Sequence, residues 1–233
     1  MSRILVINPV STSRWDVSDY DYLQRYVKSS TQVKVVSLSE GPTSLESALS
    51  VAAAEPAILA TVREYERQCD AIVLNCFADP GMRAAREISS VPVLGAAETS
   101  MLLACLLGER FSVICLDRQQ SYKVRRQARV AGVSSKLASC RWVGMLPLEL
   151  DSDRERFQDL LYTRATACVE SDGAELVVLG CTGMAFAAGR LAGRVGFPVI
   201  EPMVATVKMA ELIAGLRLTT SRRGLYSLTR LVG

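Results

Sequence analysis

Two cysteines, Cys76 and Cys181, end short apolar segments of similar make-up at residues 71–75 and 176–180. A turn containing glycine follows each cysteine, and an alanine-rich stretch comes after the turn. Pro92 stands 16 residues after Cys76, and Pro198 stands 17 residues after Cys181, each at the start of a further apolar segment. The spacing predicts one β-turn-α-β unit used twice, with a thiol at the end of a strand in each copy.

Two such thiols can invert a stereocentre without a cofactor. One thiolate removes a proton from carbon, and the other thiol delivers a proton to the opposite face. A free cysteine has a pKa of about 8.5, so a thiolate base at neutral pH needs stabilisation. A helix that begins just after a cysteine supplies unpaired N–H groups and the positive end of its dipole. The same N–H groups can hold the charge that develops on a neighbouring carbonyl.

The chain contains seven cysteines and no histidine. The absence of histidine removes the Ser-His-Asp and Cys-His routes to an activated nucleophile. The chain also lacks a C-x-x-C pair, so we expect no zinc site, no other metal and no cofactor. The other cysteines lie inside apolar runs or helical stretches, where a buried, unreactive thiol is typical; they are Cys69, Cys105, Cys115, Cys140 and Cys168.

The composition is that of a soluble globular protein. Of 233 residues, 49% are apolar and 22% are charged, and the net charge of +3 is spread along the chain. A nucleic-acid site would need a stripe of basic residues. The apolar stretch at 101–107 is far short of a membrane span, and the N-terminal apolar run reads as a strand rather than a signal peptide. We therefore expect a cytoplasmic protein with no nucleic-acid or membrane partner.

Strands alternate with helices along the whole chain, which predicts an α/β fold with mainly parallel sheets flanked by helices. The pattern restarts near residue 96, so we expect two similar Rossmann-like lobes with the active site in the cleft between them. The first lobe would comprise residues 1–96 and 205–233, and the second residues 97–204. Pro56 is expected to break a helix at 45–67. The expected strands are 3–7, 33–38, 71–75, 92–95, 111–116, 141–143, 175–180 and 198–200.

Five motifs resemble the hydantoin/allantoin racemase branch of the aspartate/glutamate racemase superfamily, in order and at suitable spacing from residue 1 to about 216. They are Asn8-Pro-Val-Ser-Thr12, Gly41-Pro-Thr-Ser-Leu-Glu46, Cys76-Phe-Ala-Asp-Pro-Gly81, Gly108-Glu-Arg-Phe-Ser-Val113 and Gly180-Cys-Thr-Gly-Met184. The resemblance implies a cofactor-free two-base mechanism with Cys76 and Cys181 as the bases. It also implies a 5-substituted hydantoin or allantoin as substrate, and a homo-oligomer.

The carbon acid of such a ring lies between a carbonyl and a nitrogen. Its enolate would be held by the turn amides near Phe77, Ala78, Thr182 and Gly183. Side chains in the loops after the first two strands would bond ring N–H and carbonyl groups: Asn8, Ser11, Thr12 and Ser44. For Asn8 the alternative is a turn residue before proline.

Other activities stay open at this point. Within the superfamily, aspartate/glutamate racemases use two cysteines, maleate isomerases use one as a nucleophile, and arylmalonate decarboxylases use one as an acid. The matched pair favours racemisation. A ligand-binding relative without turnover and a redox sensor are further alternatives.

Overall fold

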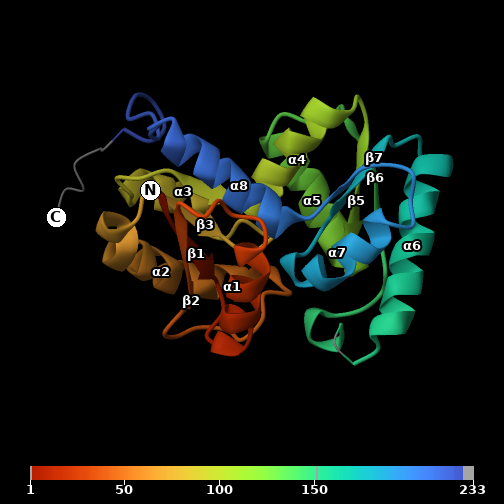
Figure 1. Cartoon of the computed structure of the whole chain (residues 1–233), viewed down its shortest axis with the longest axis horizontal. Coiled ribbons are helices and arrows are strands. Elements are labelled where there is room, and N and C mark those ends of the chain that lie inside the picture. The colour runs from red at the N-terminus through yellow and green to blue at the C-terminus, as the bar shows by residue number, and fades with distance from the viewer. Residues whose placement is uncertain (1, 151, 228–233) are drawn as a thin grey trace. The chain divides into compact units, whose positions relative to one another are not determined.

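The computed structural model describes residues 2–150 and 152–227 and shows alternating strands and helices (Figure 1). The strands are β1 (Ser2–Asn8), β2 (Thr31–Ser37), β3 (Ala71–Leu74), β4 (Val93–Gly95), β5 (Phe111–Cys115), β6 (Leu137–Trp142), β7 (Leu176–Leu179) and β8 (Val199–Ile200). The α-helices are α1 (Asp16–Gln24), α2 (Ala48–Tyr65), α3 (Met82–Ile88), α4 (Ala96–Leu107), α5 (Arg118–Val130), α6 (Arg154–Glu170), α7 (Ala185–Ala192) and α8 (Pro202–Gly215). Short 3-10 helices lie at Ser13–Trp15 (η1), Glu66–Gln68 (η2), Pro147–Glu149 (η3) and Thr182–Met184 (η4).

The chain divides into two compact units, one of residues 1–95 with 206–233 and one of residues 96–205. Each unit holds a four-stranded parallel sheet, in the order β2-β1-β3-β4 in the first and β6-β5-β7-β8 in the second. The strand order is the same in both sheets. In each, the first strand in the sequence, β1 or β5, lies between the second and the third. The predicted α/β fold with two parallel, helix-flanked sheets is thus confirmed.

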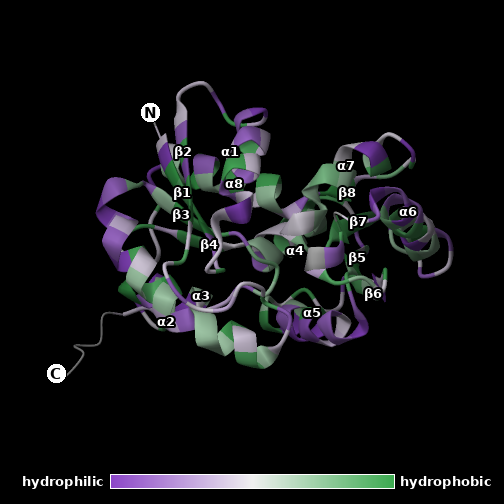
Figure 2. Ribbon diagram, turned by 90° about the horizontal axis from the view of Figure 1, so that it is seen from below, coloured by the Kyte–Doolittle hydropathy of each residue, from purple (hydrophilic) through white to green (hydrophobic). Residues whose placement is uncertain are grey.

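The first sheet is covered by helices on both faces. Leu5 and Ile7 of β1 pack with buried residues of α2 and α3 on one face. On the other face lie α1 and the part of α8 from residue 206 onward, as Figure 2 shows. Two hydrogen bonds fix α8 there, because Lys208 Nζ donates to the Tyr26 carbonyl at 3.1 Å and Glu211 Oε1 accepts from the Lys28 N–H at 3.0 Å. Burial on both faces explains why β1 is apolar without alternation.

The second sheet is sandwiched in the same way. Phe157 and Leu161 of α6 and Leu191 of α7 pack against Ile114 and Leu179 on one face. Helices α4 and α5 lie on the other face (Figure 2). Phe111 and Phe157 are among the largest fully buried side chains of the molecule, so they anchor this core.

Two local predictions are wrong. Helix α2 runs unbroken through Pro56. Proline removes one donor, to the carbonyl of Ala52, but both residues are exposed, so water can bond that carbonyl while the buried face of the helix holds it in place. Strand β6 begins at Leu137 rather than at residue 141. Ser139 lies in this strand and pairs with Ser112 of β5, the two hydroxyl oxygens being 2.8 Å apart. The polar side chain of Ser139 does not by itself suggest a strand.

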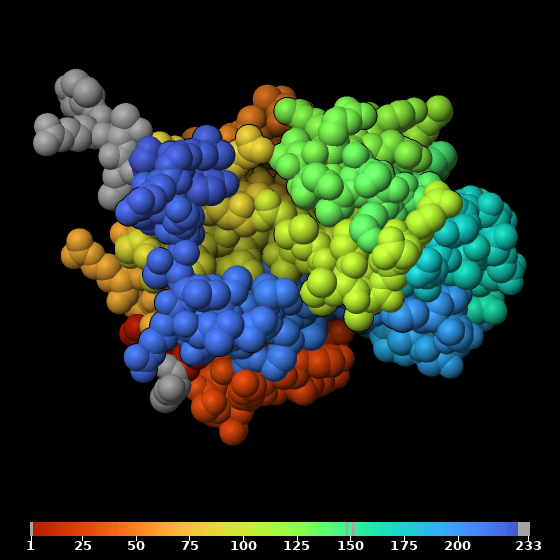
Figure 3. Space-filling model, turned by 90° about the horizontal axis from the view of Figure 1, so that it is seen from above, coloured from red at the N-terminus to blue at the C-terminus, as the bar shows by residue number. Residues whose placement is uncertain are grey.

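The segment after α8 folds back on α3, where Arg222 Nη1 donates to the carbonyls of Arg86 at 2.9 Å and Glu87 at 3.0 Å. Figure 3 shows these dark blue residues against the yellow ones. A cation thus caps the carboxyl end of the helix that follows the Cys76 turn. Residues 228–233, which were assigned to the first lobe, lie outside the described part of the chain. Among the described helices, none has the length and apolar character that crossing a bilayer requires.

The two cysteine-bearing strands end in the same way. The N–H of Asn75, after β3, bonds to the Ile7 carbonyl at 2.9 Å, and the N–H of Gly180, after β7, bonds to the Ile114 carbonyl at 2.8 Å. Cys76 and Cys181 are the next residues. They therefore occupy equivalent positions at the carboxyl edges of two sheets of one topology.

Gly180 is sterically required at its position. A Cβ there would stand 2.7 Å from the Ile114 carbonyl oxygen and 3.2 Å from Cys115 Cα, both backbone atoms of the central strand. We expect Gly180→Ala to lower the free energy of unfolding by about 1–3 kcal/mol, the usual cost of overpacking. Urea denaturation measures this. Gly196→Ala is the matched control, because a Cβ at Gly196 meets nothing within 4 Å. Equal midpoints for the two variants would contradict the steric argument.

Candidate active site

The Cys76 turn departs from the sheet immediately after its last ladder bond. The Cys76 N–H bonds to the Leu74 carbonyl at 2.9 Å, and the Cys76 carbonyl accepts the Asp79 N–H at 3.0 Å. The Ala78 N–H lies 3.5 Å from Cys76 Sγ and points to it. Cys76 itself is half-buried. An N–H directed at sulfur favours the thiolate over the thiol.

The shape of this turn depends on a glycine from the next strand. Asp79 has a positive φ of 47°, in the left-handed region that residues other than glycine seldom adopt. A Cβ on Gly95 of β4 would stand 2.4 Å from the Asp79 carboxyl group and 2.6 Å from Met82 Sδ. A side chain at position 95 would therefore displace the Asp79 and Met82 side chains. Asp79 acts here as part of the turn.

Asn8 lies at the carboxyl end of β1, beside the Cys76 turn, and is almost fully buried. Its Nδ2 donates to Asp16 Oδ1 at 2.9 Å and to Asp19 Oδ2 at 3.0 Å, and its Oδ1 accepts from Asn75 Nδ2 at 2.7 Å. Both amide hydrogens of Asn8 are thus bonded inside the protein. Asp16, Asp19 and Asn75 were not among the predicted site residues, although the two aspartates lie a few positions after the predicted ligand loop.

The other predicted polar ligands of the first unit lie in the loops at the same edge of the sheet. Ser11 Oγ donates to the Gly41 carbonyl at 2.6 Å, and the Ser11 N–H donates to the Pro42 carbonyl at 2.9 Å. These bonds join the loop after β1 to the loop after β2. The Thr12 carbonyl accepts from Ser37 Oγ at 2.8 Å, and Thr12 Oγ1 accepts from the Arg14 N–H at 3.4 Å.

Ser44 points along its own loop, with Oγ donating to Glu46 Oε1 at 2.9 Å. Phe77 is buried, with 3% of its surface exposed, whereas Ala78 is half-exposed. The structure thus places Asn8, Ser11, Thr12, Ser44, Phe77 and Ala78 at the edge that carries Cys76. Their roles as ligands stay predictions.

In the second unit, Cys181 stands at the start of η4, which Thr182 and Gly183 begin. Its backbone is extended, with φ −150° and ψ 134°, and its carbonyl accepts the Met184 N–H at 3.1 Å. A Cβ on Gly183 would come 3.5 Å from Cys181 Sγ. Position 183 therefore borders the thiol, and a side chain there would be in van der Waals contact with it.

Gln120 of α5 connects the two strands beneath Cys181. Its Oε1 accepts the Leu116 N–H at 2.7 Å, and its Nε2 donates to the Gly180 carbonyl. The side chain fills the place of a backbone ladder bond where β5 and β7 diverge. Asp117 caps α5 by accepting the Gln120 N–H at 2.7 Å, which fixes the start of the helix and so the position of Gln120. The sequence alone does not predict this role of Gln120.

Four of the other five cysteines have a raised pKa, which favours the neutral thiol, whereas the hydrogen bond with Cys115 lowers the pKa of Cys140. Burial raises the pKa of Cys69 to about 11 and that of Cys168 to about 11. A hydrogen bond to Cys140, together with burial, raises the pKa of Cys115. Cys105 is half-buried on α4. Within residues 2–150 and 152–227, no group of three or more Cys, Asp or Glu side chains is placed to hold a metal ion.

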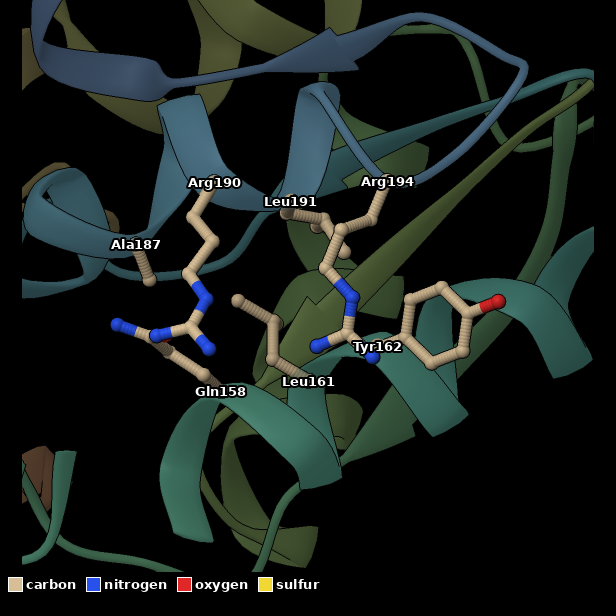
Figure 4. Close-up of a pocket in the computed structure, with 7 residues that line it drawn as sticks. All are labelled: Gln158, Leu161, Tyr162, Ala187, Arg190, Leu191 and Arg194. Carbon is tan, nitrogen blue, oxygen red and sulfur yellow. The ribbon is translucent and has the colours of Figure 1, made fainter. Parts of the chain in front are cut away.

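A shallow pocket between α6 and α7 lies apart from every predicted site residue (Figure 4). The Arg194 guanidinium stacks 4.2 Å from the centre of the Tyr162 ring, and Arg190 extends alongside. The two arginine stems cover Leu161 and Leu191, as long cationic side chains often do over apolar surface. This pocket is a packing feature at the end of α7 remote from Cys181.

Comparison with known proteins places the whole chain in one group. Residues 4–210 match the family model described as Asp/Glu/Hydantoin racemase. A hydantoin racemase of Paenarthrobacter aurescens is 33% identical over 226 residues, covering 96% of each chain.

Two solved allantoin racemases have nearly the same fold. The one from Klebsiella pneumoniae is 30% identical with a TM-score of 0.92, and the match covers 97% of this chain and 93% of that one. The one from Pseudomonas fluorescens is 27% identical with a TM-score of 0.93, covering 98% and 97%. The protein is therefore an isomerase of the racemase type that acts on a small molecule, and its chain belongs to the Asp/Glu/hydantoin racemase family.

Proposed function

We propose that this racemase inverts the C5 stereocentre of a 5-substituted hydantoin or of allantoin, with Cys76 and Cys181 as its two bases. The observation that carries the proposal is the equivalence of the two thiols, each the second residue after its strand in a sheet of the same topology. The names of the relatives, hydantoin racemase and allantoin racemase, support the choice of ring. We further propose that the two units correspond to the two predicted lobes.

In the proposed reaction, one cysteine begins as a thiolate and the other as a thiol. The thiolate takes the C5 proton, and the electron pair of the broken C–H bond moves onto the adjacent ring carbonyl as an enolate. The other thiol then gives its proton to the opposite face of C5. The product has the inverted configuration, and the two sulfurs have exchanged protonation states. Catalysis in the reverse direction starts from that state, so no cofactor is consumed.

We assign the enolate oxygen to the turn amides near Phe77 and Ala78 and near Thr182 and Gly183, where donors precede or begin a helix. The Ala78 N–H already points to Cys76 Sγ. We therefore propose that, before substrate reacts, this N–H stabilises the Cys76 thiolate.

A hydantoin ring carries both carbonyl and N–H groups, so its ligands must include donors as well as acceptors. Ser11 Oγ has given its hydrogen to Gly41 and keeps lone pairs, whereas Thr12 Oγ1 accepts a bond and keeps its hydrogen to donate. We therefore favour these two hydroxyls as ring ligands, with Ser44 next along the edge. We favour a structural role for Asn8, because both of its amide hydrogens are already donated.

The homo-oligomer implied by the resemblance and the cytoplasmic location expected from composition are carried forward as proposals. Light scattering on the purified chain tests the first, and fractionation of cells tests the second.

The two-thiol mechanism predicts a specific pattern of proton exchange in deuterium oxide. Single enantiomers of allantoin and of several 5-substituted hydantoins would be followed by proton NMR and polarimetry with wild type, Cys76→Ser and Cys181→Ser. We expect wild type to exchange the C5 proton and lose optical rotation. Each variant should lose racemisation yet exchange the proton of one enantiomer, a different one in each case, because the remaining thiol reaches one face.

Cys105→Ser is the matched control, since Cys105 is also half-buried but lies on α4 outside both turns. Racemisation that persists in either active-site variant would rule out the two-thiol mechanism. Exchange confined to free amino acids or malonates, with none for any hydantoin, would move the substrate to another branch of the superfamily.

The closeness of Gly183 to Cys181 predicts that Gly183→Ala lowers activity without unfolding the protein. The added methyl would stand 3.5 Å from Cys181 Sγ and 3.5 Å from Leu150 Cδ1, which is ordinary contact, and under the proposed mechanism it would crowd a substrate that approaches the thiol. We expect kcat/KM to fall by about 10- to 100-fold, as for a small displacement at a reacting centre. Polarimetric rates and a thermal melt measure the two effects.

Gly189→Ala in α7 is the control, because a Cβ there meets nothing within 4 Å. Alanine inside a helix should raise stability by about 0.5–1 kcal/mol and leave the rate unchanged. Full activity in Gly183→Ala would show that substrate does not approach Cys181 from that side.

A further inference from the structure

We propose that Asp19 of α1 is a positioning residue for Cys76, because its carboxylate joins the side chains of Asn8 and Asn75 and so fixes the point at which the chain leaves β3. The inference rests on the proposed function of Cys76. Asp19 lies outside the motifs that identify the family resemblance.

The geometry of the contact makes Asp19 a clamp. Asp19 Oδ2 accepts from Asn8 Nδ2 at 3.0 Å and from Asn75 Nδ2 at 3.3 Å. Asn8 ends β1, and Asn75 follows β3 and immediately precedes Cys76. Asn75 Nδ2 also donates to Asn8 Oδ1 at 2.7 Å, so the three side chains form a closed triangle. The backbone of Asn75 is bonded to Ile7, and the side chain adds the second attachment that sets its direction.

Within residues 2–150 and 152–227, the charge of one other titratable group acts on Asp19. On its own helix this is Asp16, which accepts from Asn8 at 2.9 Å and from Ser37 Oγ of β2 at 2.6 Å. From β1 and from the end of β3, the facing groups are the neutral amides Asn8 and Asn75. The charged residues Lys208 and Glu211 of α8 bond to Tyr26 and Lys28 after α1.

Burial raises the pKa of Asp19 to about 6, the bond from Asn8 acts in the opposite direction, and the charge of Asp16 adds to the rise. Because this folded-state pKa exceeds the usual Asp value of about 3.9, the stability linked to Asp19 is present at low pH and is lost as the pH rises through about 6. The ionised carboxylate thus lowers folding stability at neutral pH. It is nevertheless the stronger acceptor for the two amides, which is what a positioning role requires.

The test compares Asp19→Ala and Asp19→Asn with Asp21→Ala, an exposed aspartate on the same helix. Iodoacetamide alkylation of Cys76 and of Cys181 would be followed by peptide mass spectrometry from about pH 5 to about pH 8.5. This range covers the ionisation of the Asp19 carboxyl group and reaches the usual pKa of a cysteine thiol. The Cys181 peptide in each sample is the internal reference. Racemisation kinetics and thermal melts would be measured on the same preparations.

We expect Asp19→Ala to slow alkylation of Cys76 at neutral pH by about threefold or more, because a displaced turn loses its N–H contact to sulfur. Cys181 should react as in wild type. The kcat for racemisation should fall by about 10- to 100-fold with a smaller change in KM. Asp19→Asn keeps a neutral hydrogen-bond acceptor at every pH, as the protonated Asp19 of wild type does below about pH 6. The change in Cys76 reactivity that wild type shows when Asp19 ionises should therefore be absent in Asp19→Asn. This variant should also melt no lower than wild type at neutral pH.

A wild-type alkylation profile for Cys76 in Asp19→Ala would overturn the inference, as would equal slowing of Cys76 and Cys181. An unchanged pH profile in Asp19→Asn would also overturn it. The alkylation readout does not depend on turnover. If wild type fails to racemise any substrate while the Cys76 profile shifts as expected, the proposed function fails and the positioning role stands.

Discussion

One backbone hydrogen bond in each sheet determines where a thiol can be. The Asn75 N–H reaches the Ile7 carbonyl at 2.9 Å, and the Gly180 N–H reaches the Ile114 carbonyl at 2.8 Å. Each acceptor belongs to an inner strand that is buried on both faces and paired on both edges, so its position is tightly constrained. The next residue is the cysteine. The position of its Cα is therefore set by the buried strands. Only the turn after the cysteine needs further contacts to hold it in place.

The two units support that turn by different means. In the first unit the strand end is held by a polar network in which Asn8, Asn75 and Asp19 are joined by three hydrogen bonds. In the second unit the equivalent of Asn75 is Gly180, which has no side chain to bond and no room for one. There Gln120 enters from α5 and bonds to backbone groups of both strands. The two sheets share one topology, but the end of the cysteine-bearing strand is held by polar side chains in the first unit and by close packing around a glycine in the second.

Much of this could be predicted from sequence, for identifiable reasons. Strands β1, β3, β5 and β7 are continuous apolar runs because both sheet faces are covered, and the repeat pointed to Cys76 and Cys181. The prediction at Pro56 was wrong because Pro56 and Ala52 lie on the exposed side of α2, which the residue type alone does not reveal. Asp19 and Gln120 were missed because they bond to residues 56 and 60 positions away. In the sequence, Asp16 and Asp19 resemble the acidic first turn of any helix.

The polar solution in the first unit carries a cost that the steric one does not. Burying an ionisable carboxyl group raises its pKa and lowers folding stability at the pH where it is charged. An asparagine or serine at position 19 would avoid that cost and still accept a hydrogen bond. A carboxylate accepts two amides through one oxygen more strongly than a neutral group can, and both amides here belong to the strand ends that flank Cys76. Selection for folding alone would favour the neutral residue, so the charge at Asp19 is best explained by the demands of the thiol that it positions.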